Sequence, residues 1–266
     1  MTAPSDCFTS HADHEILKKI KRSCVLCSTP RTGSTLLAKS MYRTRSLGHP
    51  GEYCNSVNTG AIKTAADLSN YFLEIKKTTT PNGIFSMKIH WNQLSQVAQQ
   101  TGKLRQTPLT ATQWMLEYIP APHYIFIRRR DKVRQAVSLL FSHETKVWDA
   151  PAGQPPPPVP KSISYQRKKI NYLIRRIEAE ERCWQRFFEK NDLAPLTFWY
   201  EDFSKNIPGT LTQIADYMGV SLWRPVSQYD LPSRRHGSSF KKFWLLRYRL
   251  ESFFADAAAR LLRRQS

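Results

Sequence analysis

The sequence predicts a single α/β domain whose central sheet is mainly parallel. Short apolar segments typical of strands alternate with segments whose apolar residues recur at helical spacing, a pattern that places helices between parallel strands. A junction of strand, polar loop and helix lies near the start of the chain, at 24–41. No shift in composition marks a second domain within the 266 residues, so the expected unit is 1–266.

The predicted strands are short apolar runs that start or stop at turn signals or charges. The second follows the turn signal Pro81-Asn82-Gly83, and the third is bounded by Pro122 and by a run of three arginines. In chain order, the predicted strands are 23–28, 83–89, 123–127 and 196–200.

The predicted helices carry apolar residues three and four positions apart, so that each buries one face. Leu68, Phe72 and Ile75 show this spacing in one helix, and Val133, Val137 and Leu140 in another. In chain order, the predicted helices are 33–43, 65–77, 91–100, 110–117, 131–147, 164–189, 208–218 and 240–264.

Three segments have special expectations. Residues 1–20 form an N-terminal extension. Residues 149–160, DAPAGQPPPPVP, form a surface loop, because proline removes amide donors and fixes φ. The segment 240–264 is basic and amphipathic, which is typical of a packed helix with a solvated cationic face; contact with a membrane surface or with nucleic acid is the alternative.

Composition limits the class of protein. The 41% hydrophobic content suits a globular protein, and no apolar run is long enough for a transmembrane helix. No secretory signal is evident and the five cysteines are odd in number, which together predict a cytoplasmic protein with reduced thiols. Cys24 and Cys27 are expected to be small buried residues, and no metal site is predicted. The net charge of +19 favours an anionic partner, which charge alone does not identify.

The loop at 29–35 is the first candidate anion site. Gly33 permits close backbone approach, the amides at a helix start bind anions, and Arg31, Thr32, Ser34 and Thr35 add a charge and hydroxyls. The loop lacks the Gly-Lys-Ser/Thr of a nucleotide-hydrolysing loop. An ordinary helix start capped by Thr32 or Ser34 is the alternative.

The second candidate site follows the strand at 123–127. Arg128, Arg129 and Arg130 end this strand, and an arginine fork suits phosphate oxygens. Ser138 lies about two turns into the next helix. Arg129 with Ser138 is the favoured pair, and Arg130 is the competitor.

These motifs together resemble the sulfotransferases that use 3′-phosphoadenosine 5′-phosphosulfate (PAPS) as donor. In such enzymes the first loop holds the 5′-phosphosulfate, the arginine and serine hold the 3′-phosphate, and no metal is needed. The resemblance implies a P-loop-like three-layer sandwich. The motifs RTGSTLL, LGHPGEY, MKIHWNQ, RRDKVRQAVS and ERCWQRFF occur in the order seen in the bacterial trehalose 2-sulfotransferase family.

That resemblance assigns roles to further residues. It makes Glu52 the general base, with His49 as the alternative, and Arg31 the residue that faces the transferring sulfonate. Tyr53, Lys88 and Trp91, with Asn92 and Gln93, would line the acceptor site. Arg235 and Gly237 would belong to a loop over the nucleotide.

The expected activity is sulfonate transfer from PAPS to a hydroxyl of a sugar or glycolipid, with a trehalose-like acceptor as one option. The resemblance also implies a homodimer. One rival is a nucleotide-dependent small-molecule kinase on a related topology, against which the missing Lys-Ser/Thr counts. Another is a non-catalytic binder of nucleic acid or of a membrane surface, driven by the charge; nucleic acid is not the expected partner.

Overall fold

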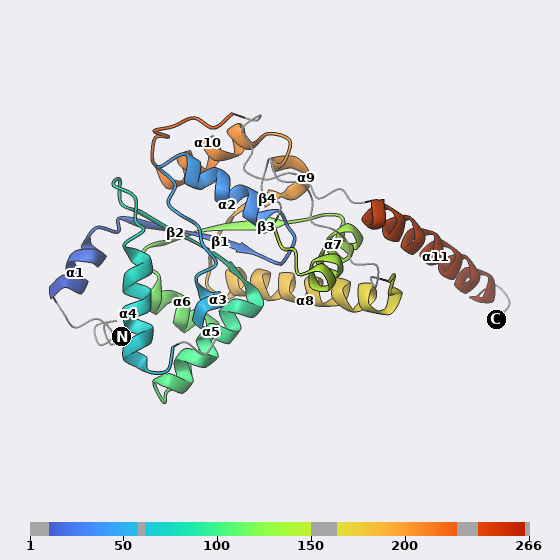
Figure 1. Ribbon diagram of the computed structural model, residues 1–266, viewed down its shortest axis with the longest axis horizontal. Helices are drawn as coiled ribbons and strands as arrows, with labels where there is room; N and C mark the ends of the chain where they lie inside the picture. Colours follow the sequence, from blue (N-terminus) through green and yellow to red (C-terminus); the bar gives the residue numbers. More distant parts are fainter. Residues whose placement is uncertain (1–10, 58–61, 150–163, 228–238, 264–266) are drawn as a thin grey trace. The chain divides into compact units, whose positions relative to one another are not determined.

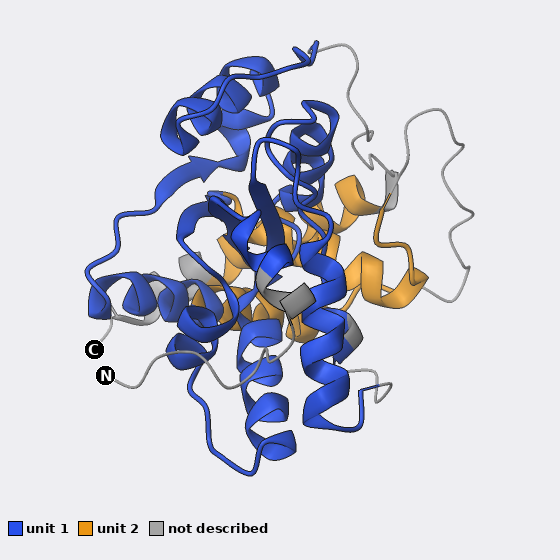
Figure 2. Cartoon of the chain, turned by 90° about the vertical axis from the view of Figure 1, so that its left-hand side faces the viewer, with its two compact units in different colours: residues 1–130, 179–232 blue, residues 131–178, 233–266 orange. Residues whose placement is uncertain are grey.

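The computed structural model describes residues 11–57, 62–149, 164–227 and 239–263. The chain divides into two compact units (Figure 2). The first comprises residues 1–130 and 179–232, and the second comprises residues 131–178 and 233–266. The predictions for residues 150–160, Arg235 and Gly237 lie outside the described residues.

The first unit is built on a four-stranded sheet in which every neighbouring pair is parallel. Its strand order is β2-β1-β3-β4. The strands are β1 (Arg22–Ser28), β2 (Ile84–His90), β3 (Pro122–Arg128) and β4 (Leu196–Trp199). Helices cover both faces (Figure 1), so the predicted three-layer α/β fold with a parallel sheet is confirmed.

Strand β1 shows why both faces of the sheet are covered. Its residues alternate between two hydrophobic cores: Val25 and Cys27 belong to one, Cys24 and Leu26 to the other. The two cysteines are buried and free, as predicted. The first core is closed by α3 (Cys54–Val57), α4 (Ala65–Lys76), α5 (Trp91–Leu104), α6 (Ala111–Tyr118) and the last turns of α8 (Arg167–Lys190). The second is closed by α2 (Ser34–Arg43), α9 (Tyr200–Phe203) and α10 (Ile207–Met218).

Local signals set several helix ends. Thr64 caps α4 and Thr110 caps α6, each through a reciprocal capping box. Gly219 ends α10 in the left-handed region, at φ +59°. Such caps explain why most predicted helices agree with the observed ones to within a few residues.

Three short helices were not predicted, and one of them is α3. The segment expected to be a strand at 196–200 leaves the sheet after Trp199, and Tyr200 begins α9. Helix α1 (His11–Lys18) lies within the expected N-terminal extension. All three are too short for helical spacing of apolar residues to distinguish them from a turn.

The second unit consists of α7 (Lys132–Thr145), the first turns of α8, and α11 (Ser239–Arg263). Trp244 of α11 is buried with Val137 of α7 and Ile170 of α8. Asp131 caps α7 by accepting a hydrogen bond from the Arg134 amide, so the helix begins one residue later than predicted. None of the helices in the described ranges combines the length and apolar character needed to cross a membrane.

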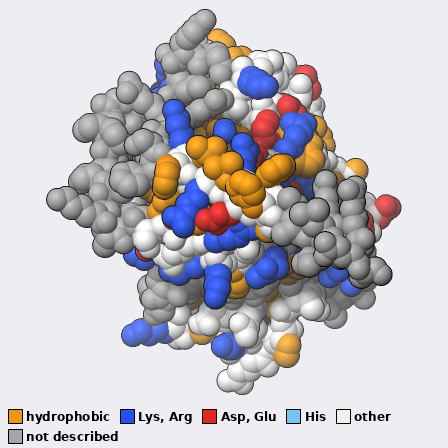
Figure 3. Space-filling view, turned by 90° about the vertical axis from the view of Figure 1, so that its right-hand side faces the viewer, with side chains coloured by type: hydrophobic (Ala, Val, Ile, Leu, Met, Phe, Trp, Pro, Cys, Tyr) orange, Lys and Arg blue, Asp and Glu red, His pale blue; other side chains and the backbone are white. Residues whose placement is uncertain are grey.

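Charge and apolar surface are mixed on the outside of the protein. On the face drawn in Figure 3, exposed hydrophobic side chains lie among Lys and Arg side chains. Helix α11 contributes exposed apolar residues as well as the buried Trp244: Phe243, Leu246, Leu250, Phe253 and Phe254. Helix α11 is packed through Trp244, and these exposed apolar residues are a feature that the sequence analysis did not predict.

Trp114 provides a test of the first core. Its side chain is fully buried, its ring stacks on Tyr118 at 5.1 Å between centroids, and its Nε1 donates to Thr101 Oγ1 at 3.1 Å. We expect Trp114→Ala to lower the free energy of unfolding by about 3–5 kcal/mol, measured by urea denaturation. Leu116→Ala, on the same helix but 64% exposed, should change it by less than about 0.5 kcal/mol. A loss below about 1 kcal/mol for Trp114→Ala would contradict this packing.

Candidate active site

The loop between β1 and α2 has the backbone of an anion cradle. Gly33 lies in the left-handed region at φ +83°, and Arg31 does so at φ +65°. A Cβ on Gly33 would lie 2.4 Å from Tyr200 Cδ2, so only glycine fits there. The first amides of α2 have no acceptor within the helix, and the positive end of its dipole lies behind them.

The alternative of an ordinary side-chain cap is wrong for this helix. Gly33 is the N-cap residue of α2 and no side chain caps it. Thr32 Oγ1 instead donates to the Thr29 carbonyl at 3.0 Å, which braces the loop internally. At the N-cap of α2, therefore, no side chain accepts a hydrogen bond from the first amides of the helix.

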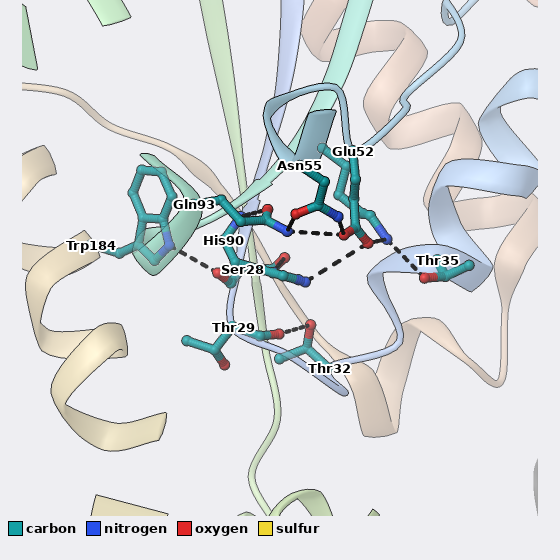
Figure 4. Close-up of polar contacts among 10 residues, drawn as sticks. Ser28, Thr29, Thr32, Thr35, Glu52, Asn55, His90, Gln93 and Trp184 are labelled. Atoms are coloured by element: carbon teal, nitrogen blue, oxygen red, sulfur yellow. Dashed lines mark hydrogen bonds and ion pairs between the residues drawn. The ribbon is translucent and has the colours of Figure 1, made fainter. Parts of the chain in front are cut away.

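Glu52 lies at the centre of a polar cluster drawn in Figure 4. Its Oε2 accepts hydrogen bonds from Asn55 Nδ2 at 2.8 Å and from Gln93 Nε2 at 2.9 Å. Its Oε1 pairs with Lys88 Nζ and lies 3.9 Å from His90 Nε2. Both carboxylate oxygens are thus oriented by groups from α3, α5 and the end of β2.

Lys88 connects this cluster to the loop. Its side chain is only 5% exposed, and its Nζ donates to Thr35 Oγ1 at 2.8 Å as well as pairing with Glu52. Thr35 is in the first turn of α2. One ammonium group therefore joins the anion cradle to the candidate base.

The charges in the cluster shift two pKa values. Burial raises the pKa of Glu52, but the charge of Lys88, the charge that His90 carries at low pH, and the hydrogen bonds from Lys88 and Gln93 outweigh it and lower the pKa to about 2. Burial lowers the pKa of His90 to about 4 against the opposing effect of Glu52. At neutral pH, Glu52 is therefore charged and His90 is neutral, so Lys88 supplies the positive charge that faces Glu52.

The position of Glu52 depends on how its loop lies along β2. Gly48, at φ +81°, is so close to Ser86 that a Cβ would lie 2.1 Å from Ser86 Oγ. Gly51 bridges to Met87, and its carbonyl accepts the Lys88 amide at 2.9 Å. This attachment to β2 brings Glu52 beside Lys88.

The two neighbours of Glu52 in its motif have other contacts. His49 is exposed, with its ring 4.5 Å from that of Tyr42. Tyr53 donates its hydroxyl to the His49 carbonyl at 2.7 Å, and its ring stacks on Phe85. Tyr53 thus braces the loop.

His90 is fixed from the opposite side by β1. Its Nδ1 lies 2.9 Å from Ser28 Oγ, and Trp184 Nε1 donates to the Ser28 carbonyl at 2.9 Å. The ring of Trp91 packs edge-on against Trp184 at 5.1 Å. The next residue, Asn92, keeps a buried Oδ1 to which no hydrogen bond is made among the described residues.

The three consecutive arginines differ in their contacts. Arg128 Nε donates to Glu181 Oε1 at 2.6 Å. Arg130 forms a bidentate ion pair with Asp202, in which Nη1 and Nη2 donate to the two carboxylate oxygens at 2.8 and 2.6 Å. Arg129 is 9% exposed, and its Nη1 donates at 3.0 Å to the carbonyl of Arg31 in the cradle. Of the three, Arg129 is the one bonded to the loop.

The sequence model of the family described as Stf0 sulphotransferase matches residues 23–251. The chain belongs to the Stf0 sulphotransferase family. The match includes segments of both compact units and confirms the resemblance found in the motifs. The protein is accordingly a transferase enzyme of the sulfotransferase class.

Two trehalose 2-sulfotransferases and one solved structure are similar to this chain. The chain is 23% identical over 268 residues to a trehalose 2-sulfotransferase of Mycobacterium tuberculosis (strain ATCC 35801 / TMC 107 / Erdman), covering 89% of this chain and 97% of the relative. It is 25% identical over 230 residues to the same-named enzyme of Mycolicibacterium smegmatis (strain ATCC 700084 / mc(2)155), covering 73% and 83%. A sulfotransferase structure from Alicyclobacillus acidocaldarius is similar with a TM-score of 0.48 and 12% identity, over 91% of this chain and 94% of that one.

For this Stf0 family member, the structure gathers part of the predicted site. Thr35, Glu52, Lys88 and Gln93 form one connected cluster. Ser138 lies on α7 in the second unit, and its pairing with Arg129 stays a prediction. No group of three potential metal-ligating side chains occurs in the part of the chain that the structure describes.

Sequence reasoning missed two members of the cluster. Asn55 contacts both Glu52 and Gln93, and its only signal was a position three residues after Glu52 in a short helix. His90 ends its strand, and the motifs assign it no role. The spacing Lys88-x-His90 on β2, with both side chains on one face of the strand, was the available signal.

The Glu52 cluster predicts a pH-dependent stability. The pKa of Glu52 is lowered from about 4.3 to about 2, so its contribution is present above about pH 5 and is lost as the pH falls toward 2. That difference corresponds to roughly 3 kcal/mol. We expect urea denaturation to show a gap between wild type and Glu52→Gln that is largest at pH 7 and narrows below pH 5.

Glu74→Gln is the matched control for that experiment. Glu74 forms only a surface pair with Lys77, so its variant should differ from wild type by less than about 1 kcal/mol at any pH. A gap for Glu52→Gln that stays constant from pH 7 to pH 3 would show that Glu52 is not held by Lys88.

Proposed function

We propose that this enzyme transfers a sulfonate from PAPS to a hydroxyl of a sugar or glycolipid, with Glu52 as the general base. The proposal rests mainly on Lys88, whose side chain contacts both Thr35 and Glu52. A single residue therefore connects the candidate base to the anion cradle. The names of the two relatives support a trehalose-like acceptor.

In the proposed reaction, Glu52 takes the proton of the acceptor hydroxyl while that oxygen forms a bond to the sulfur of the donor. The bond from sulfur to the bridging oxygen of the phosphosulfate breaks, and adenosine 3′,5′-bisphosphate leaves. In this proposal, the first amides of α2, Arg31 and Lys88 would stabilise the charge that develops on the leaving phosphate. No metal ion is required for any of these steps.

The cofactor contacts that we propose are those predicted from the sequence. Thr32, Gly33, Ser34 and Thr35 would surround the 5′-phosphosulfate, and Arg129 with Ser138 the 3′-phosphate. The contacts of Arg130 with Asp202 favour Arg129, since the fork of Arg130 is already occupied by a carboxylate. The roles of Arg235 and Gly237, the homodimer, the cytoplasmic location and a peripheral membrane contact stay predictions.

A direct assay tests the proposal. Purified protein is mixed with labelled donor and with trehalose, glucose or sugar lipids, and transfer of label is measured. Adenosine 3′,5′-bisphosphate should raise the melting temperature more than ATP with magnesium, because a ligand that binds only the folded state stabilises it. Absence of both transfer and nucleotide binding would reject the proposed function.

Replacing the proposed base should remove turnover but not nucleotide binding. We expect Glu52→Gln to lower kcat by about 10²–10⁴-fold, the usual effect of losing a general base, while the variant still binds adenosine 3′,5′-bisphosphate. His49→Gln is the control, since His49 is the alternative base and is exposed on the same loop. Loss of turnover in His49→Gln with retention in Glu52→Gln would transfer the role to His49.

The adjacent arginines offer a matched pair of variants. We expect Arg129→Lys to weaken binding of adenosine 3′,5′-bisphosphate by about tenfold or more, because lysine cannot reproduce the fork. Arg130→Lys should weaken it by less than about threefold, because Arg130 pairs with Asp202. Isothermal titration calorimetry measures both, and the opposite ranking would make Arg130 the phosphate ligand.

A further inference from the structure

Lys88 is shared between two groups that sulfonate transfer would use at different moments. Its ammonium contacts Thr35 in the cradle and the carboxylate of Glu52. Lys88 is also buried, so in the unliganded protein Glu52 is the counter-ion that compensates its charge. An anion entering the cradle beside Thr35 would be a second counter-ion for the same ammonium.

While this pair is intact, Glu52 is poorly suited to accept a proton. Lys88 occupies Oε1, and Asn55 and Gln93 both donate to Oε2. The pKa of about 2 that results makes the carboxylate a weak base at neutral pH. Glu52 is therefore well placed but not yet reactive.

We propose that binding of the donor's phosphosulfate in the cradle draws Lys88 away from Glu52 and thereby activates the base. The lysine has a flexible stem and three N–H donors, so it can keep Thr35 while exchanging the carboxylate for a donor oxygen. This inference rests on the proposed function and gives Lys88 a role in it: Lys88 acts as a positioning residue toward Glu52 and contacts the departing phosphate.

The groups around Glu52 determine the state of its carboxylate after the exchange. Asn55 on α3 and Gln93 on α5 are neutral and remain bonded to Oε2, which keeps the carboxylate in place. His90, at the end of β2, is neutral, and its Nε2 lies 3.9 Å from Oε1. The positive charge of Arg31 in the cradle lowers the pKa of His90 further. Without Lys88, Oε1 is open to the acceptor hydroxyl, and burial raises the pKa of Glu52.

Proton uptake on nucleotide binding tests this exchange independently of turnover. The probe is adenosine 3′,5′-bisphosphate, whose 5′-phosphate would occupy the cradle. Calorimetric titrations at about pH 5, in buffers of different ionisation enthalpy, give the number of protons bound per ligand. Subtracting the value for Glu52→Gln from that for wild type removes the titration of the ligand's own phosphates. We expect a Glu52-dependent uptake of a substantial fraction of a proton.

The role of Lys88 is tested by repeating this comparison in Lys88→Met. The proton uptake of the double variant, Lys88→Met with Glu52→Gln, is subtracted from that of Lys88→Met alone. There Glu52 has already lost its counter-ion before the ligand binds, so the Glu52-dependent uptake should fall to less than about half. Lys77→Met, which removes an exposed lysine on the end of α4, is the matched control and should leave the uptake unchanged. Lys88→Gln, which keeps a hydrogen-bond donor without the charge, provides the same comparison if Lys88→Met does not fold.

The outcomes separate this inference from the proposed function. Binding without Glu52-dependent uptake, or uptake that persists in full in Lys88→Met, overturns the exchange and leaves the sulfotransferase proposal standing. Failure of adenosine 3′,5′-bisphosphate to bind wild type overturns the proposed function, and the inference with it.

Discussion

The ion pair between Lys88 and Glu52 is the interaction on which the site depends. An ammonium with 5% exposure cannot remain without a counter-ion, because an unpaired buried charge costs several kcal/mol. The loop that carries Glu52 must therefore lie along β2, and it does so because Gly48 and Gly51 allow close approach of the two backbones. Gly48 and Gly51 thus allow Glu52 to reach the charge on the neighbouring strand.

The parallel sheet gives this pair its location. In register, Ser28 of β1 pairs with His90 of β2 and with Ile127 of β3, so that the three strands end together. The cradle follows β1, the charged pair lies at the end of β2, and the arginines follow β3. Loops that are far apart in the sequence are therefore collected at one edge, as expected for a ligand site in an open α/β sheet.

The parts of the site that depend on local backbone conformation could be predicted from the sequence. Gly33 after a strand predicted the cradle, and short apolar runs predicted β1 and β2. The different contacts of Arg129 and Arg130 could not be predicted, since the pair of Arg130 depends on Asp202 in α9, more than seventy residues away. Tyr200, the first residue of α9, was predicted to be in a strand, although its ring is what requires glycine at position 33.

Stability and reactivity make opposite demands on Glu52. Pairing with Lys88 stabilises the fold by lowering the pKa of the carboxylate, and the same lowering weakens it as a base. A carboxylate fixed permanently in that pair would be a structural residue. The contact of Lys88 with Thr35 changes this, because it brings a competing anion-binding loop to the same ammonium. In the exchange that we propose, the ligand resolves this conflict, because the buried lysine rather than the carboxylate changes its partner.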